Sequence, residues 1–256
     1  MSTGSSGGSS GSDDHRPPSW SMWLAAGAAT VAIVGGLLTI PSQVKSLLAE
    51  SSADASTAPA EEARQVGPGW GPQRTMYTVR SPSPTAALNS IKDNPSYGDT
   101  RNFTRCRNMD RDYNKFVDAV AVTGSSQIEV IVLLENASVR PGEDIAQTSM
   151  HAFIQETPSD DPVIYVELTG RTTTTREYIK IWDGCQVMSD KPIKLSYLPG
   201  SGKVVTNDRP DEVPVDDEII RGTALIPGSE GRPDGYVHAS TSSYGFFTFT
   251  VLAVPI

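Results

Sequence analysis

Residues Ile128–Leu134 read IEVIVLL, an apolar run that is interrupted only by Glu129. Most of its side chains are β-branched, a Gly/Ser cluster precedes it, and Asn136 follows it. A β-branched run between turn-forming residues is typical of a β-strand, because such side chains pack well on a pleated surface. The segment is therefore predicted to be a strand.

Three other runs have a similar character. They are Val163–Leu168, Glu177–Trp182 and the closing stretch Tyr244–Val254, which predicts a long final strand. Ala146–Gln155 fits either a short helix or another strand. Short apolar runs separated by glycine and proline therefore dominate the second half of the chain and indicate β structure.

The run that ends at Trp182 also shows the alternation of a strand. Successive side chains of a strand point to opposite faces of the sheet. Tyr178, Lys180 and Trp182 are therefore predicted to share one face. Ile179 and Ile181 are predicted to share the other face.

These strands predict the fold class of residues 74–256. Their spacing favours an immunoglobulin-like antiparallel β-sandwich with Greek-key connections. The region is longer than a minimal immunoglobulin-like unit, so long loops or extra strands are expected. The chain is thus predicted to be mainly β, with one transmembrane helix ahead of the sandwich.

The predicted transmembrane helix is Trp20–Ile40, and no charged side chain occurs between Arg16 and Lys45. At about 1.5 Å per residue the helix is roughly 31 Å long, which matches a hydrocarbon core of about 30 Å. Trp20 and Trp23 lie at one end, where indole rings prefer the headgroup layer. The run is therefore interpreted as a membrane anchor.

Two other interpretations of this run are a cleavable signal peptide and a buried core helix. A signal peptide has an apolar region of about 7–15 residues after a short basic stretch. Here a nearly uncharged segment comes first, and the small-residue pairs that could form a cleavage site lie well beyond Ile40. The flanking segments offer nothing to bury a core helix, so a retained anchor is favoured.

The anchor divides the chain into four zones. Residues 1–19 are Ser/Gly-rich and are predicted to be a disordered cytoplasmic tail. Residues 20–40 span the membrane, and residues 41–73 are predicted to form a flexible linker. Residues 74–256 then form the extracytoplasmic sandwich domain. The expected localisation is the cell membrane, single-pass, with the N-terminus cytoplasmic and the C-terminal domain extracellular.

The net charge of −9 falls on residues 46–256, since the charges before that point cancel. An acidic domain repels phosphate backbones and anionic lipid, so no nucleic-acid partner is expected. The membrane is contacted through the anchor. Within it, Ala28, Ala32 and Gly36 are spaced four apart, which permits close packing of two helices and predicts a weak homodimer.

The two cysteines, Cys106 and Cys185, both lie in the predicted extracytoplasmic domain. They have neither the ligand number of a zinc site nor the spacing of a redox motif. A disulfide would close a loop of about 80 residues and add a few kcal/mol of stability. The alternative is two separate buried thiols.

No catalytic residue, cofactor site or metal ligand is predicted. Of the three histidines, His15 precedes the anchor, which leaves His151 and His238 in the domain. Serines follow His238, but no glycine-flanked nucleophile turn surrounds them. Leu198–Lys203 is predicted to be a turn, because it lacks the spacing and the following helix of a phosphate loop. The protein is therefore not expected to be an enzyme.

Asn207–Glu218 is the strongest cluster of charge. Its oxygens could hold Ca²⁺, but it lacks the alternation of a calcium loop, and a solvated acidic loop is favoured. A rival hypothesis is a carbohydrate-binding or hydrolytic domain that uses loop carboxylates, with Asp208, Asp211 and Asp216 as the candidates.

Several segments in order resemble a family of uncharacterised, membrane-anchored or secreted proteins of actinobacteria, related in style to conserved-repeat surface domains. The opening motif NSIxDNPxxGDxRNF lies within Leu88–Phe103. The other matching segments are Glu135–Ser138, Ile181–Asp183, Leu195–Ser201 and Phe247–Phe249. The resemblance implies an immunoglobulin-like sandwich and no established catalytic activity.

The resemblance covers about Met76 to Ile256, with two departures. Glu135 stands where the family would have an asparagine, and Asp99-Thr100 stands where Asp-Glu would precede Arg101. Within the motif, Asn94-Pro95 and Gly98-Asp99 favour turns, and the neighbouring charged groups are expected to bind backbone or each other.

The leading hypothesis is a non-enzymatic, membrane-anchored surface or envelope protein that presents a β-sandwich to an unknown protein or cell-wall partner. The carbohydrate-binding or hydrolytic domain is the first alternative. A subunit of an envelope assembly or secretion apparatus is the second, in which packing of the anchor would matter most.

Overall fold

The computed structural model describes residues 68–111, 115–207, 210–227, 233–239 and 245–256. The described residues of each segment predicted to be a strand lie in a strand, apart from Glu177, which precedes β7. IEVIVLL forms most of β4. In chain order the elements of this part of the chain are β1 (Trp70–Gly71), β2 (Thr104–Asn108), β3 (Ala119–Ala121), β4 (Ser126–Leu134), β5 (Ile145–Ile154), β6 (Val163–Thr172), β7 (Tyr178–Met188), β8 (Ile193–Tyr197), β9 (Lys203–Thr206), β10 (Val213–Pro214), α2 (Asp217–Ile220), β11 (Arg221–Leu225) and β12 (Gly245–Pro255).

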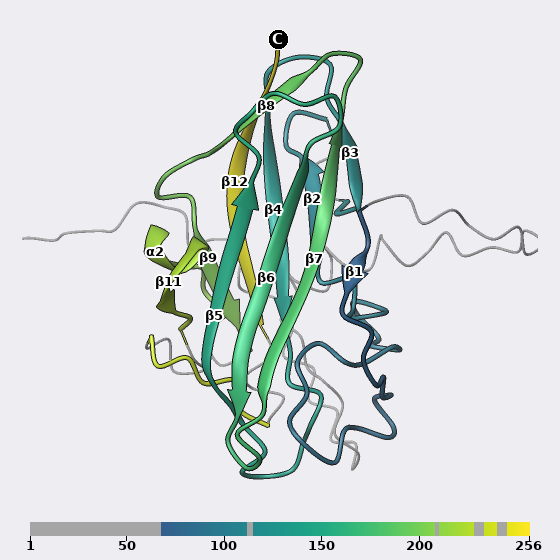
Figure 1. Ribbon diagram of the computed structural model, residues 1–256, viewed down its shortest axis with the longest axis vertical. Coiled ribbons are helices and arrows are strands. Elements are labelled where there is room, and N and C mark those ends of the chain that lie inside the picture. Colours follow the sequence, from purple (N-terminus) through teal and green to yellow (C-terminus); the bar gives the residue numbers. More distant parts are fainter. Residues whose placement is uncertain (1–67, 112–114, 208–209, 228–232, 240–244) are drawn as a thin grey trace, which may run out of the picture. The chain divides into compact units, whose positions relative to one another are not determined.

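The strands form two sheets. The β4 sheet has the order β10-β9-β12-β4-β2, and β8 also pairs with β12. The β6 sheet has the order β1-β7-β6-β5-β11, and β3 also pairs with β7. All these pairings are antiparallel except that of β3 with β7. In Figure 1, β5, β6 and β7 lie in front of β12, β4 and β2. The fold is therefore mainly β, with two layers as in a β-sandwich.

Apolar side chains fill the space between the sheets. From β6, Ile164, Val166 and Leu168 are fully buried, and β12 contributes Phe247 and Phe249. A fully buried side chain of this size contributes about 1.5–3 kcal/mol relative to an exposed one. These inward residues alternate with outward ones along each strand. The outer face of the β6 sheet therefore carries a different set of side chains from the face that packs in the core.

The alternation predicted for the start of β7 is confirmed. Ile181 is buried, whereas Tyr178 and Lys180 are exposed and Trp182 is half-buried on the opposite side. Ala146–Gln155, which fitted a helix or a strand, coincides almost completely with β5. It is a strand because it lies between two partners, pairing with β6 along one side and with β11 along the other.

The sandwich begins earlier than the sequence predicted. Trp70 and Gly71 pair with Asp183 and Trp182 of β7, although both lie in the segment expected to be a flexible linker. They join the sheet because β7 has backbone groups available along that edge. The expected tail 1–19, the anchor Trp20–Ile40 with its stripe of small residues, and linker residues 41–67 lie outside the described residues. Within the residues that are described, no helix is long and apolar enough to cross a membrane.

Candidate functional site

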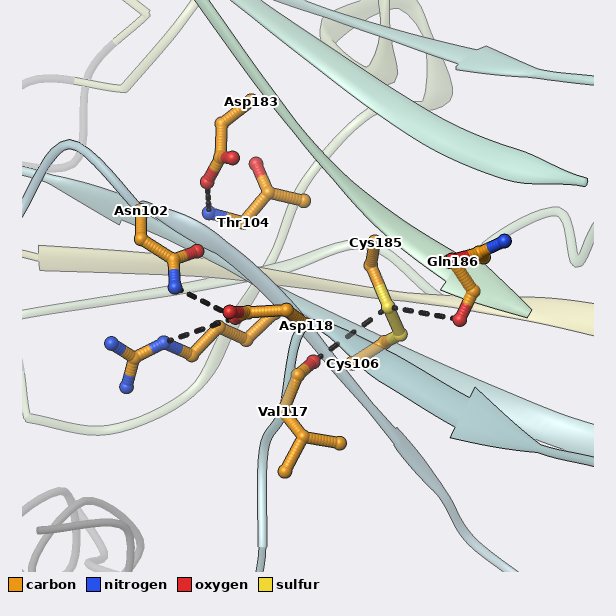
Figure 2. Close-up of a disulfide and its surroundings, with 9 residues drawn as sticks. Asn102, Thr104, Cys106, Val117, Asp118, Asp183, Cys185 and Gln186 are labelled. Atoms are coloured by element: carbon orange, nitrogen blue, oxygen red, sulfur yellow. Dashed lines mark hydrogen bonds and ion pairs between the residues drawn. A yellow bond between two sulfur atoms is a disulfide. The ribbon is translucent and has the colours of Figure 1, made fainter. Parts of the chain in front are cut away.

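A disulfide joins Cys106 of β2 to Cys185 of β7, as one of the two sequence interpretations predicted. The two Cα atoms lie 6.1 Å apart, within the range that a disulfide requires. Because β2 belongs to the β4 sheet and β7 to the β6 sheet, the bond links the two layers of the fold (Figure 2). Both cysteines are fully buried, which marks the bond as structural.

A second link between the sheets runs beside the disulfide. The backbone N–H of Thr104 donates to Oδ2 of Asp183 at 2.6 Å, two residues before each cysteine (Figure 2). Asp183 is almost fully buried, and burial raises the pKa of its carboxyl group to about 8. The carboxyl group thus holds the start of β2 against β7 from within the core.

The motif segment Leu88–Phe103 forms a polar network with the end of β4. The side chain of Asn94 accepts hydrogen bonds from the backbone of Ser96 and Tyr97, and its Nδ2 donates to Oε1 of Glu135 at 3.0 Å. Asn89 donates from Nδ2 to the carbonyl of Leu133 and accepts from the N–H of Glu135. The family-like motif is therefore part of the folding scaffold.

The charged residues of the motif bind backbone and each other, as predicted. Asp93 accepts a hydrogen bond from the N–H of Val79, and Arg101 pairs with Asp99. The guanidinium of Arg101 also lies 4.3 Å from the ring centroid of Trp70, which fixes the first residue of β1 to the motif. These groups are occupied by structural contacts and leave no cluster directed at a ligand.

Glu135 is the least expected member of this network, because its side chain is buried. Burial raises the pKa of Glu135 to about 7, against the opposing effect of its hydrogen bond with Asn94. The hydroxyl group of nearby Thr100 accepts from the N–H of Ile91 and donates its proton to the carbonyl of Ile91. Oε2 of Glu135 therefore has no hydrogen bond within the described part of the chain.

The acidic loop offers no assembled site in the residues that are described. Asp216 caps α2 by accepting from the N–H of Glu218, and Glu212 pairs with Lys203 at 2.6 Å. Asp211 is exposed, and Asp208 lies outside the described residues. No group of three or more His, Cys, Asp or Glu side chains that could hold a metal ion occurs within residues 68–256, apart from the undescribed gaps.

The two domain histidines make different contacts. Nδ1 of His238 lies 3.3 Å from Oδ2 of Asp144, and the ring of Tyr236 stacks on the imidazole. The serines at 240, 242 and 243 lie outside the described residues. His151 lies on β5 in contact with the ring of Phe153, at a centroid distance of 3.9 Å.

The outer face of the β6 sheet carries the most distinctive surface of the described residues. Phe153, Tyr165, Glu167, Lys180 and Trp182 project from β5, β6 and β7 on the side opposite the core, and we call this set the aromatic face. Phe153 is 46% exposed and Tyr165 is 37% exposed, values that are high for large apolar side chains on a sheet. Exposed apolar surface of this kind marks a candidate binding site.

Strand register brings these residues together. Phe153 of β5 lies opposite Tyr165 of β6. Glu167, two residues further along β6 and on the same face, lies opposite Trp182 of β7. Neighbouring strands are about 4.8 Å apart, so side chains on the same face come into contact. The rings of Tyr165 and Trp182 are nearly perpendicular, at 78°, with their centroids 5.9 Å apart.

Glycines support two of the rings. A Cβ atom on Gly71 would lie 2.6 Å from Cζ2 of Trp182, and one on Gly184 would lie 2.9 Å from Cδ1 of Tyr165. Each ring therefore rests directly on the backbone of a neighbouring strand, which no other residue type would allow without a shift. The rings are held in place before any partner binds.

One ion pair crosses the aromatic face. Nζ of Lys180 lies 2.6 Å from Oε2 of Glu167, and this hydrogen bond raises the pKa of the lysine. Phe153, Tyr165, Glu167 and Trp182, with Val166, line a depression of about 440 Å³. That volume lies within the range of about 300–1,000 Å³ found for sites that bind small ligands.

The alternation of β7 predicted that Lys180 and Trp182 share one face, but it did not identify the site. Phe153, Tyr165 and Glu167 were missed, although they alternate with apolar residues in their own strands. That alternation was the available signal. Of the other residues weighed for function, His151 adjoins the aromatic face, because it contacts Phe153 and lies opposite Glu167. The described residues of the acidic loop and His238 are not among the residues that line the depression.

Asn102 and Asn136 each begin an Asn-x-Ser/Thr triplet, the acceptor pattern of N-glycosylation, but both triplets have structural roles. Nδ2 of Asn136 donates to the carbonyls of Glu143 and Val237, and Ser138 is fully buried. Nδ2 of Asn102 donates to Asp118 at 2.7 Å, and Thr104 is fully buried. A glycan on either asparagine would displace a hydrogen bond of the fold.

The resemblance to actinobacterial surface proteins remains a prediction, which the geometry neither requires nor contradicts. The motif that carries it folds as scaffold and points to no ligand. Comparisons with protein-family models, with curated proteins and with solved structures find no match to this chain.

Proposed function

We propose that the chain is a non-enzymatic, membrane-anchored envelope protein whose sandwich domain binds a partner through the aromatic face. The observation that carries this proposal is the set of exposed and half-buried rings on β5, β6 and β7 around a depression of about 440 Å³. Rings fixed against glycines lose little conformational freedom when a partner binds, so they suit recognition.

The geometry of the aromatic face favours binding over hydrolysis. Glycoside hydrolysis generally uses two carboxyl groups about 5–9 Å apart. Glu167 is the single carboxylate among the residues that line the depression, and it is paired with Lys180. A binding role is therefore the simpler use of this face.

The proposed location outside the cell is supported by the disulfide and by the apolar run. Structural disulfides persist in oxidising compartments, and Cys106–Cys185 is fully buried between the sheets. The uncharged stretch Trp20–Ile40 has the length of a membrane span. In the proposed arrangement the N-terminus is cytoplasmic and the sandwich is extracellular.

The proposed immunoglobulin-like arrangement is supported by two features of the fold. A disulfide links the two facing sheets, as in antibody domains. β12 pairs with β4, β8 and β9, so that strands far apart in the chain are neighbours, which is typical of Greek-key connections.

Protease treatment of intact cells tests the location. Cells that express the full chain with a C-terminal tag are treated with protease, and the tag is followed on gels with and without reductant. We expect loss of the tag from intact cells, and a mobility change on reduction of untreated chain. A tag that survives until the membrane is permeabilised would place the domain inside and contradict the proposal.

Co-sedimentation tests the binding surface. The full chain in lipid nanodiscs is mixed with envelope fragments from cells that lack it, and the bound fraction is measured for wild type and for Phe153→Ala/Trp182→Ala. We expect the double variant to lose at least tenfold in affinity. The matched control is Tyr178→Ala, because Tyr178 is 57% exposed on β7 but does not line the depression. Equal binding by all three proteins would refute a role for the aromatic face.

A further inference from the structure

The depression in the aromatic face combines two kinds of chemistry in one place. Its walls are the rings of Phe153, Tyr165 and Trp182, and its polar group is the carboxylate of Glu167. Lys180 reaches the same carboxylate from β7, so an ammonium donor lies beside the acceptor. Apolar rings next to a donor and an acceptor suit a ligand that has both apolar and hydroxyl-bearing surfaces.

A pyranose sugar is such a ligand. Its axial C–H bonds form an apolar patch that stacks on an aromatic ring, whose face carries negative charge. Its equatorial hydroxyl groups both donate and accept hydrogen bonds, so they can bind a carboxylate and an ammonium group together. The perpendicular rings of Tyr165 and Trp182 allow a sugar to stack on one ring while its edge contacts the other.

The charges of the site favour a neutral ligand. Glu167 and Lys180 neutralise each other at 2.6 Å, so the aromatic face has no net charge of its own. The chain as a whole carries a formal charge of −9, which repels anionic polymers at a distance.

The size of the depression favours a short stretch of ligand over a folded protein. Specific protein interfaces bury about 800 Å² on each partner. The depression of about 440 Å³ is instead within the range for small ligands, which suits one or two sugar rings of a longer chain. We infer that the aromatic face binds a neutral polysaccharide, with Tyr165 and Trp182 stacking on sugar rings and Glu167 and Lys180 binding hydroxyl groups.

This inference rests on the proposed function and identifies the chemical class of its partner. The test uses the full chain in lipid nanodiscs, because detergents with sugar headgroups would compete for the site. The probes are a soluble β-1,4-glucan, an α-mannan and chitin oligosaccharides, and binding is followed by tryptophan fluorescence and by calorimetry. We expect saturable binding of at least one probe.

Three variants locate the binding. Trp182→Ala should weaken binding at least tenfold, because it removes a stacking surface. Glu167→Gln keeps the size of the side chain and should weaken binding about threefold to tenfold, because an amide accepts hydroxyl protons less strongly. Tyr178→Ala is the control and should stay within twofold of wild type. Circular dichroism of each variant shows whether the sandwich is intact, and the isosteric Glu167→Gln keeps the test informative if Trp182→Ala unfolds.

Failure of the inference can be told apart from failure of the proposed function. If no polysaccharide binds but envelope fragments still bind through Phe153 and Trp182, and protease treatment of the fragments abolishes that binding, the partner is a protein and the inference is wrong. If neither polysaccharides nor envelope fragments bind, the proposed function fails as well. Binding that Tyr178→Ala weakens as much as Trp182→Ala would also overturn the inference.

Discussion

Replacing Glu135 by glutamine tests how the domain depends on pH. Glu135 follows β4 directly, and only 4% of its surface is exposed. Its Oε1 accepts a hydrogen bond from Nδ2 of Asn94 at 3.0 Å. Glutamine has nearly the same shape and can keep that hydrogen bond through its own oxygen, but it cannot ionise. The variant therefore removes the titration and leaves the packing in place.

The magnitude follows from the shift in pKa. Burial raises the pKa of Glu135 from an ordinary value of 4.5 to about 7. Each pKa unit corresponds to about 1.4 kcal/mol, so ionisation costs the folded state about 3 kcal/mol more than the unfolded state. The folded state holds the proton more tightly. This contribution to the free energy of unfolding is fully present below pH 4.5, declines as the pH rises, and is lost above pH 7.

The assay is urea unfolding of the full chain with its disulfide intact, at several pH values between 4.5 and 8. Glutamine places an amide where Oε2 lacked a partner, which costs about 1–3 kcal/mol at every pH. The informative quantity is therefore how the difference in unfolding free energy between the variant and wild type changes with pH. Relative to wild type, the free energy of unfolding of Glu135→Gln should rise by about 3 kcal/mol between pH 4.5 and pH 8.

The control is Glu156→Gln, because the side chain of Glu156 is exposed after the end of β5. Its difference from wild type should vary by less than about 0.5 kcal/mol over the same pH range, as is usual for surface substitutions. If Glu135→Gln also shows a constant difference from wild type, the carboxyl group does not titrate near neutral pH, and the explanation from burial is wrong.

Two further predictions concern the cross-link and the glycines. Joint replacement of Cys106 and Cys185 by alanine should lower the free energy of unfolding by about 4–5 kcal/mol, because the bond closes a loop with a sequence separation of 79; a loss under about 1 kcal/mol in urea unfolding would contradict this. Gly184→Ala should cost about 1–3 kcal/mol and shift tryptophan fluorescence, because the new methyl group would lie 2.9 Å from the ring of Tyr165. Gly124→Ala, whose added methyl group meets nothing within 4 Å, is the matched control and should change neither measurement.

The local sequence pattern predicted those strands whose own residues favour β structure. IEVIVLL became most of β4, and Tyr244–Val254 became most of β12, because β-branched and aromatic residues between turn formers favour a strand wherever it pairs. The alternation around Trp182 likewise predicted both faces of β7 from the sequence of one strand. The alternating direction of successive side chains depends only on the backbone of one strand.

The shortest elements could not be predicted this way. β1 and β10 have two residues each and exist as strands because a partner lies beside them. β1 reads as linker in the sequence, since Gly and Pro surround Trp70. Pairing with β7 supplies hydrogen bonds that no local pattern indicates.

Glu135 shows the same limit for charge. A glutamate after a strand suggests solvent exposure, because an ionised carboxylate is costly to bury. Its burial depends on Asn94 and the rest of the motif segment, which come from far earlier in the chain. The raised pKa is therefore a property of the folded arrangement.

The sequence by itself determined the class of the fold and the faces of individual strands, and it allowed the pairing of the two cysteines. These follow from backbone geometry and from residue types that act over a few neighbouring positions. Only the tertiary structure decided that Phe153 and Tyr165 lie with Trp182 around one depression, because their meeting depends on the register of three strands. Register is a relation between segments, set by which inner faces pack together in the core, and no single segment carries it.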